Sequence, residues 1–129
     1  TFANFSGRGT NFPDVNVLKP DLAAPGVHVI ARVPPGYTHA ERDALAAGTL
    51  AAGPAWASYD GTSMATPHVS AVAALVWRYF PTCTGEQIRQ SLNKSAKDLN
   101  IAGRDNKTGY GLVQAKAAKD RITSLGCGN

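Results

Sequence analysis

The stretch from Gly61 to Pro81 constrains this chain more than any other. Gly61-Thr62-Ser63 is followed by residues that are apolar or small on nearly every helical face, and Pro81 ends the run. A helix that is apolar all round is buried on every side, so the sequence predicts a buried central helix from about Ser63 to Phe80. Pro67 falls in its first turns, where we expect the missing backbone N–H to cost little.

Ser63 would lie at the N-terminus of this helix. Backbone N–H groups there have no partner within the helix, and the helix dipole favours developing negative charge. A serine in that position is well placed to act as a nucleophile. A serine at a helix start is also a common N-cap, so both interpretations stay open on these residues alone.

A nucleophilic serine needs a base, and the local candidates are poor. His68 is five residues after Ser63, which turns it roughly 140° away round the helix. We expect it to be a buried histidine with both ring nitrogens hydrogen-bonded. Neither His28 nor His39 has a local feature that brings it to Ser63, and a carboxylate such as Asp60 is by itself a weak base for a serine hydroxyl. The base must therefore come from outside these residues.

Short strands and an irregular insertion are predicted before the central helix. We expect strands at residues 15–18, 27–31 and 56–59. Of these, 27–31 is the clearest because it is β-branched and follows a Pro-Gly turn, and it would place His28 in mid-strand on a partly exposed face. Residues 34–57 begin with Pro34-Pro35-Gly36 and carry an alanine-rich run, within which a short helix is expected at about 41–47; the family resemblance given below implies that 34–57 is a variable loop insertion.

Two further helices are predicted after Pro81. Thr84 and Gln87 fit a capping box, and apolar residues recur at helical spacing after them, which predicts an amphipathic helix at about 85–95. A last helix is expected at about 113–122. Together the elements predict one α/β layered domain over residues 1–129. Two or three strands make too small a sheet to cover the central helix, so further strands are expected to lie elsewhere.

Charge and composition exclude some partners. The net charge of +4 is uneven: residues 1–77 carry four basic and five acidic side chains, whereas residues 78–129 carry nine and four. The basic residues are scattered and are not interleaved with aromatics, which favours a solvated surface over nucleic-acid binding. No stretch approaches the ~18 apolar residues of a membrane span. The chain begins at Thr1 without a methionine, and we expect a further segment upstream.

Cys83 and Cys127 are the only cysteines. Neither has a neighbour at metal-ligand spacing, so a zinc site is not expected. A disulfide between them would close a long loop and tie the C-terminus to the end of the central helix. Two unpaired buried thiols are the alternative. The disulfide is the favoured interpretation, and it implies a secreted or otherwise extracytoplasmic protein.

Four motifs resemble those of the subtilisin-like serine proteases, or subtilases. The most specific is Gly61–Val69, which resembles the family's nucleophile motif. Phe5–Gly9 is similar to its "FSSRG" stretch. Leu18–Gly26 is similar to its "KPDIAAPG" segment, in the form common among subtilases with an inserted protease-associated domain. Tyr110–Val113 resembles the small closing motif before the last helix. The resemblance covers roughly the whole chain except residues 34–57.

This resemblance implies that the chain is the C-terminal part of a three-layer α/β fold, in which helices flank a parallel sheet. In the family a Ser-His-Asp triad performs acyl transfer. Ser63 would be the nucleophile, with its own backbone N–H as one oxyanion donor, and Gly61, Thr62 and Met64 would line the substrate site. Core packing is an equal alternative for Met64. The family's Asp and His motifs and its oxyanion Asn lie N-terminal to the matched region, so this chain alone is expected to be inactive.

The predicted function is therefore a serine endopeptidase segment that acts on polypeptide substrates through an acyl-enzyme. Its catalytic Asp and His would come from a missing N-terminal part of the catalytic domain, and neither nucleic acid nor a membrane is an expected partner. A non-catalytic interaction module derived from a degenerate subtilase is the alternative. Calcium is common in the family, but no acidic cluster here resembles a calcium site, so no cofactor or metal is predicted.

Overall fold

The computed structural model describes residues 3–11, 14–32, 39–49 and 56–129. Its elements, in chain order, are β1 (Gly9–Asn11), β2 (Asp14–Lys19), β3 (Val29–Arg32), α1 (His39–Ala46), β4 (Trp56–Tyr59), α2 (Thr62–Tyr79), α3 (Gly85–Ser95) and α4 (Ala115–Leu125). β1 pairs with β2 and β3 with β4, both antiparallel. Within the described ranges, the parallel pairing is an isolated bridge between Ala23 and Leu112.

The helices agree closely with the sequence pattern. α2 begins one residue before the predicted start, and α3 has the predicted bounds. The capping box is confirmed: the Gln87 backbone N–H donates to Thr84 Oγ1 at 3.3 Å, and the Thr84 N–H donates to Gln87 Oε1 at 2.8 Å. α4 begins two residues later than predicted and ends at Leu125. The short helix expected inside the insertion is α1, while residues 34–38 and 50–55 of that insertion lie outside the described residues.

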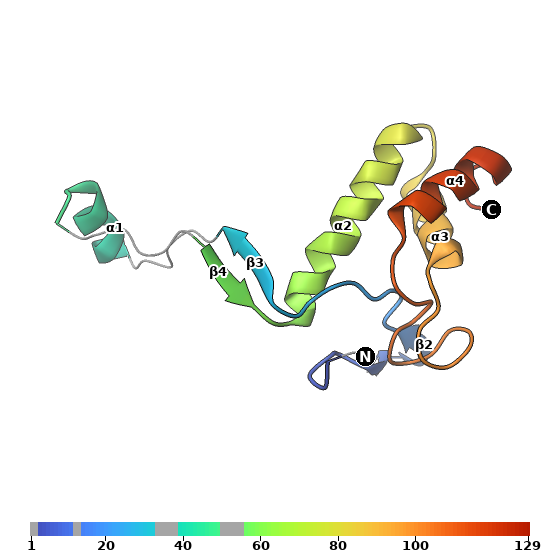
Figure 1. The fold of residues 1–129 in the computed structure, drawn as a ribbon, viewed down its shortest axis with the longest axis horizontal. Helices are drawn as coiled ribbons and strands as arrows, with labels where there is room; N and C mark the ends of the chain where they lie inside the picture. The colour runs from blue at the N-terminus through green and yellow to red at the C-terminus, as the bar shows by residue number, and fades with distance from the viewer. Residues whose placement is uncertain (1–2, 12–13, 33–38, 50–55) are drawn as a thin grey trace.

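Helices α2, α3 and α4 enclose the hydrophobic core (Figure 1). Its buried members are Val76, Cys83, Ile88, Leu92, Ala118 and Ile122. A disulfide joins Cys83 to Cys127 with a Cα–Cα distance of 5.5 Å, so the alternative of two unpaired thiols is wrong. The bond ties the segment after α2 to the residues that follow α4, and it thereby links both ends of the helical core.

Most of α2 is nevertheless open to solvent, contrary to the prediction of a helix buried on every side. Val76 is its buried residue, whereas Leu75, Trp77 and Tyr79 remain 52%, 44% and 59% exposed. The reason is that α3 and α4 cover one face of α2, while β3, β4 and α1 extend away from the helical core (Figure 1). No helix in the described ranges is both long and apolar enough to cross a membrane.

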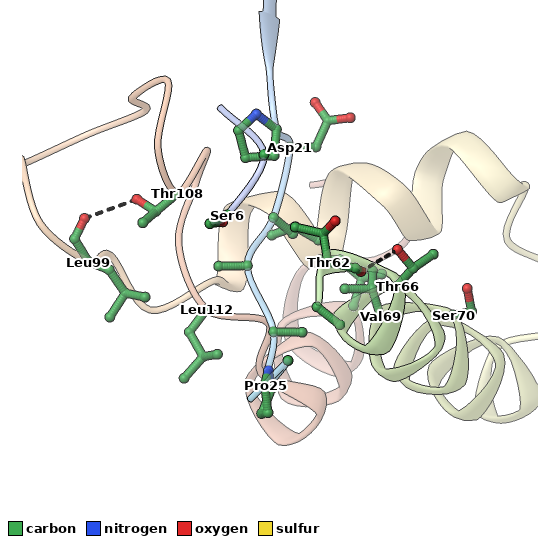
Figure 2. Close-up of a pocket in the computed structure, with 18 of the residues that line it drawn as sticks. Ser6, Asp21, Pro25, Thr62, Thr66, Val69, Ser70, Leu99, Thr108 and Leu112 are labelled. Atoms are coloured by element: carbon green, nitrogen blue, oxygen red, sulfur yellow. Dashed lines mark hydrogen bonds between the residues drawn. The ribbon is translucent and has the colours of Figure 1, made fainter. Parts of the chain in front are cut away.

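An open groove of about 1140 Å³ runs beside α2 (Figure 2). One wall is the face of α2 that carries Thr62, Thr66, Val69 and Ser70. The loop of residues 20–27, part of α3, and residues from 3–7 and 99–112 line the rest of the groove. Ser63 is not among the lining residues. The groove therefore reaches Gly61 and Thr62 at the start of α2 but does not include Ser63.

The loop beside this groove has one paired and one open edge. The Ala23 N–H donates to the Gly111 carbonyl at 2.9 Å, and the Val113 N–H donates to the Ala23 carbonyl at 3.0 Å. The backbone groups of Leu22 and Ala24 make no hydrogen bond to another described residue. Because backbone groups alternate in direction along an extended segment, those of Leu22 and Ala24 form the edge that has no partner.

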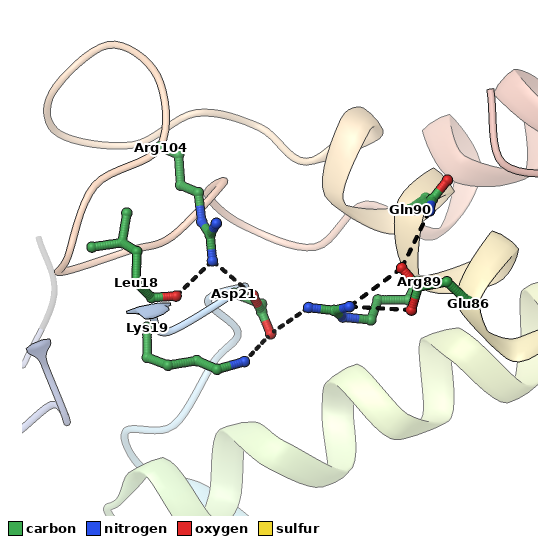
Figure 3. Close-up of polar contacts among 7 residues, drawn as sticks. All are labelled: Leu18, Lys19, Asp21, Glu86, Arg89, Gln90 and Arg104. Atoms are coloured by element: carbon green, nitrogen blue, oxygen red, sulfur yellow. Dashed lines mark hydrogen bonds and ion pairs between the residues drawn. The ribbon is translucent and has the colours of Figure 1, made fainter. Parts of the chain in front are cut away.

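Asp21 joins three separate parts of the chain (Figure 3). Its carboxylate accepts hydrogen bonds from Lys19 Nζ at 2.6 Å, from Arg89 on α3 at 3.4 Å, and from Arg104 in the loop before α4 at 3.0 Å. Its backbone carbonyl accepts the Tyr110 N–H at 2.8 Å. The Arg104 guanidinium also lies over the Tyr110 ring, 4.9 Å from its centroid.

The cationic neighbours of Asp21 control its ionisation. Partial burial alone would raise the pKa of this carboxyl. The hydrogen bond and charge of Lys19, followed by those of Arg89, more than offset that effect, so the pKa of Asp21 lies below its usual 3.8. The backbone of Asp21 also lies very close to Gly109, because a Cβ on Gly109 would overlap the Asp21 carbonyl. Only glycine fits there.

Replacing Asp21 by Asn should lower the free energy of unfolding near neutral pH by about 1–2 kcal/mol, because three cations lose their shared anion. The folded-state pKa is lowered, so this contribution is present above the unfolded pKa and is lost as the pH falls below 3.8 toward the folded value. The free energy of unfolding of the variant should therefore change less with pH in that acid range than that of the wild type. Urea unfolding across the range measures this.

The matched control is Asp120→Asn, which breaks a fully exposed pair with Lys116 on α4. Such exposed pairs contribute little to stability, so we expect Asp120→Asn to lower the free energy of unfolding less than Asp21→Asn does. Equal losses in the two variants would contradict a special role for Asp21.

Replacing Cys83 and Cys127 together by serine should lower the free energy of unfolding by about 2–4 kcal/mol, because the unfolded chain regains the entropy of the loop between them. Thermal unfolding with and without a thiol reductant checks this. The reductant should lower the melting temperature of the wild type toward that of the double variant and leave the variant unchanged. A wild type insensitive to complete reduction would contradict the prediction.

Candidate active site

Ser63 is the second residue of α2 and is exposed. The N-cap position belongs to Gly61, and no side chain caps this helix, so the interpretation of Ser63 as an N-cap is wrong. Neither its Oγ nor its backbone N–H is hydrogen-bonded to any residue in the described part of the chain. Both groups are thus available at the positive end of an 18-residue helix.

A close approach of two backbone segments sets where α2 begins. The Gly61 N–H donates to the Gly26 carbonyl at 2.7 Å, and the Gly61 carbonyl accepts the Met64 N–H at 3.0 Å. A Cβ on Gly26 would lie only 2.7 Å from the Gly61 oxygen and 3.3 Å from the Ala65 Cβ. Glycine at position 26 is therefore needed for the loop to touch the start of α2. Sequence reasoning missed this role, although the Pro25-Gly26 pair marked the loop.

Asp60 adds a second bond at the same junction. Its Oδ1 accepts the backbone N–H of His28 at 2.5 Å. The prediction that His28 lies in mid-strand is wrong, because its φ of 52° is left-handed and β3 begins only at Val29. The ring of His28 is 84% exposed, and its Nδ1 lies 3.6 Å from the same carboxylate oxygen. Asp60 is thus tied to the loop mainly through the backbone of His28.

The three predicted substrate-binding residues surround Ser63 in the chain but face different ways. Thr62 lines the groove in Figure 2, and its carbonyl accepts the hydroxyl of Thr66 at 2.9 Å. Met64 is half-buried, and its Sδ lies 3.5 Å from where a Cβ on Gly61 would be. Gly61 contacts Gly26 as described above. Their contact with substrate stays a prediction.

His68 is held away from Ser63, as the helical spacing predicts. Its Nδ1 lies 2.8 Å from the carbonyl oxygen of Met64. A carbonyl only accepts, so Nδ1 carries the proton. The residue is half-buried, so the prediction of a buried histidine is wrong, and this bond satisfies one of the two ring nitrogens expected to be paired. The neighbouring Pro67 lies inside α2 and has no backbone N–H to donate to the Ser63 carbonyl. Pro67 therefore costs the helix one hydrogen bond and is less favourable there than predicted.

No metal centre is evident in the described ranges, where no three His, Cys, Asp or Glu side chains gather as ligands would. Calcium is common in the family that the sequence resembles, but no site for it was identified in the sequence, and no step of the chemistry is assigned to a metal.

The profile of the Subtilase family matches residues 1–111. This chain belongs to the subtilase family. It is 35% identical to Subtilisin-like protease SBT4.12 of Arabidopsis thaliana over 121 residues, which are 90% of this chain and 16% of that protein. It is 40% identical to fervidolysin of Fervidobacterium pennivorans over 101 residues, which are 75% of this chain and 14% of that protein. The chain therefore spans only about a sixth of the length of these curated relatives.

Solved structures of subtilases share its fold. The crystal structure of fervidolysin superimposes with a TM-score of 0.59 at 38% identity, covering 74% of this chain and 14% of that one. The psychrophilic subtilisin-like protease Apa1 of Pseudoalteromonas sp. AS-11 gives a TM-score of 0.56 at 53% identity, covering 58% and 17%. The architecture is thus part of an α/β subtilisin fold, as predicted. The likeness to subtilases with a protease-associated domain stays a prediction.

Replacing Gly26 by Ala should slow the reaction of Ser63 with a fluorophosphonate at least about tenfold in the full-length protein, because displacing the start of α2 misplaces the serine. Active-site labelling followed by peptide mapping measures the rate. Gly7→Ala is the matched control, since a Cβ there would meet nothing closer than 3.9 Å. A Gly26→Ala protein that melts and reacts like the wild type would contradict this account of the junction.

Proposed function

We propose that this chain is the nucleophile-bearing part of a secreted serine endopeptidase that hydrolyses polypeptides through an acyl-enzyme. The observation that carries the proposal is the state of Ser63: its hydroxyl and its backbone N–H are both free of described partners at the start of α2, in a chain of the subtilase family. A nucleophile and one oxyanion donor in one residue are what acyl transfer requires from this part of the fold.

In this mechanism Ser63 Oγ attacks the carbonyl carbon of the scissile peptide bond, and the Ser63 N–H donates a hydrogen bond to the resulting oxyanion. A histidine takes the hydroxyl proton and passes it to the leaving amine, and a carboxylate orients that histidine. None of the three histidines of this chain hydrogen-bonds to Ser63. We therefore assign the histidine, its carboxylate partner and the second oxyanion donor to an upstream part of the same protein.

The unfilled groove supports such a partner. Its lining includes the α2 residues Thr62, Ala65, Thr66 and Ser70 and the open backbone edge at Leu22 and Ala24. An extended strand of the upstream part would pair with that edge and cover this face of α2. Both features are unfavourable in a chain that stands alone, since unpaired edges and exposed apolar faces invite association.

The disulfide supports the proposed location. Disulfides persist in oxidising compartments and are rare in reducing ones, and the bond between Cys83 and Cys127 closes the core on which Ser63 is mounted. Secretion places the enzyme where polypeptide substrates are encountered outside the cell.

A fluorophosphonate probe should label the full-length protein at Ser63, and Ser63→Ala should abolish labelling and lower peptidase activity by at least about 10³-fold. Residues 1–129 alone should stay unlabelled because the base is absent, and adding the separately produced upstream part should restore labelling. Ser124→Ala, an exposed position on α4, is the control and should label normally. A full-length protein that binds partners but neither labels nor cleaves would overturn the proposal in favour of a degenerate interaction module.

A further inference from the structure

We propose that Asp60 is a positioning residue for Ser63. Its carboxylate fixes the turn that starts α2 by accepting the backbone N–H of His28. The inference rests on the proposed role of Ser63 as nucleophile, and it assigns to Asp60 a task that turn formation alone would not require.

The strand register explains why a side chain is needed here. Val29 pairs with Tyr59 in the ladder between β3 and β4, so His28 is the next residue opposite Asp60. The left-handed φ of 52° at His28 takes that residue out of the ladder. Its N–H would then have no strand carbonyl to bind, and Asp60 Oδ1 takes the place of that acceptor at 2.5 Å.

Two hydrogen bonds of opposite direction therefore join the same two segments. Gly61 donates to the carbonyl of Gly26 at 2.7 Å, and Asp60 accepts from His28. The ladder between β3 and β4 holds Val29 against Tyr59, and these two bonds extend that attachment to the residues that directly precede α2. This pair is the last attachment of the chain before α2 begins.

Ser63 depends on that attachment because no described residue bonds to its side chain. Its Oγ makes no hydrogen bond to a described residue, and only Gly61 and Thr62 separate it from Asp60. Glycine gives the backbone unusual conformational freedom. The hydrogen bond that holds Asp60, just before Gly61, therefore limits the directions in which the hydroxyl and the N–H of Ser63 point. A shift of about 1 Å in a reacting group can cost about 100-fold in rate.

The geometry of the carboxylate, and not its charge, carries this role. Asp60 is 42% exposed, and the His28 ring beside it is 84% exposed with a separation of 3.6 Å. An ion pair so open to water contributes little to stability, whereas the backbone N–H of His28 donates a hydrogen bond to the carboxylate. Substitutions that separate geometry from charge therefore test the inference.

In the full-length enzyme, Asp60→Ala should lower kcat about tenfold and change KM less than about twofold, because the nucleophile is misaligned while substrate contacts remain. Asp60→Asn keeps an acceptor oxygen in place and should stay within about threefold of the wild-type kcat. Asp60→Glu keeps the charge but displaces the oxygens, and should resemble the alanine variant. His28→Asn keeps the backbone N–H and suits the left-handed φ, so it should resemble the wild type.

Asp98→Ala is the matched control. It removes another exposed carboxylate that accepts a backbone N–H, that of Gly103 at 2.6 Å, in the loop between α3 and α4, outside the junction of residues 26–28 with 60–61. It should leave kcat unchanged, and melting curves of all variants show whether each is folded. Should Asp60→Ala not fold, the Asn and Glu pair still decides the matter.

Wild-type kcat in Asp60→Ala, or a normal Glu variant beside a defective Asn variant, would overturn the positioning role while the proposed function stands. A wild-type protein that does not label at Ser63 would instead overturn the proposed function, and this inference with it.

Discussion

The hydrogen bond from the Gly61 N–H to the Gly26 carbonyl joins the two parts on which this structure depends. On one side is the loop of residues 20–27, and on the other is the start of α2, the helix that carries Ser63. Neither residue has a side chain, which is why the two backbones come so close. The position of the candidate nucleophile follows from that contact and from the neighbouring hydrogen bond between the His28 N–H and Asp60.

The same loop is anchored at its other end by charge. Asp21 binds Lys19 at the end of β2, Arg89 on α3 and Arg104 in the loop before α4, so it ties the loop to the helical core from two directions (Figure 3). Its lowered pKa shows that these contacts favour the ionised form despite partial burial. An ionic anchor at Asp21 and a backbone contact at Gly26 together hold the segment that positions Ser63.

The helical core is small in the described part of the chain. Six apolar residues are buried there, and much of α2 and one edge of the loop beside it remain uncovered. The disulfide between Cys83 and Cys127 compensates in part, because it restricts the unfolded chain. The open surfaces agree with a chain that spans about a sixth of its relatives, since the missing strands of a subtilisin fold would cover them.

Local chemistry in the sequence determined the helices and much of the candidate site. The capping residues Thr84 and Gln87 and the long apolar run after Ser63 specify their helices without distant contacts. Helical geometry alone turned His68 away from Ser63. Tertiary structure decided what depends on two distant segments meeting. The left-handed turn at His28, the need for glycine at position 26 and the bond to Asp60 all arise from contact between residues 26–28 and 60–61, which no local pattern encodes.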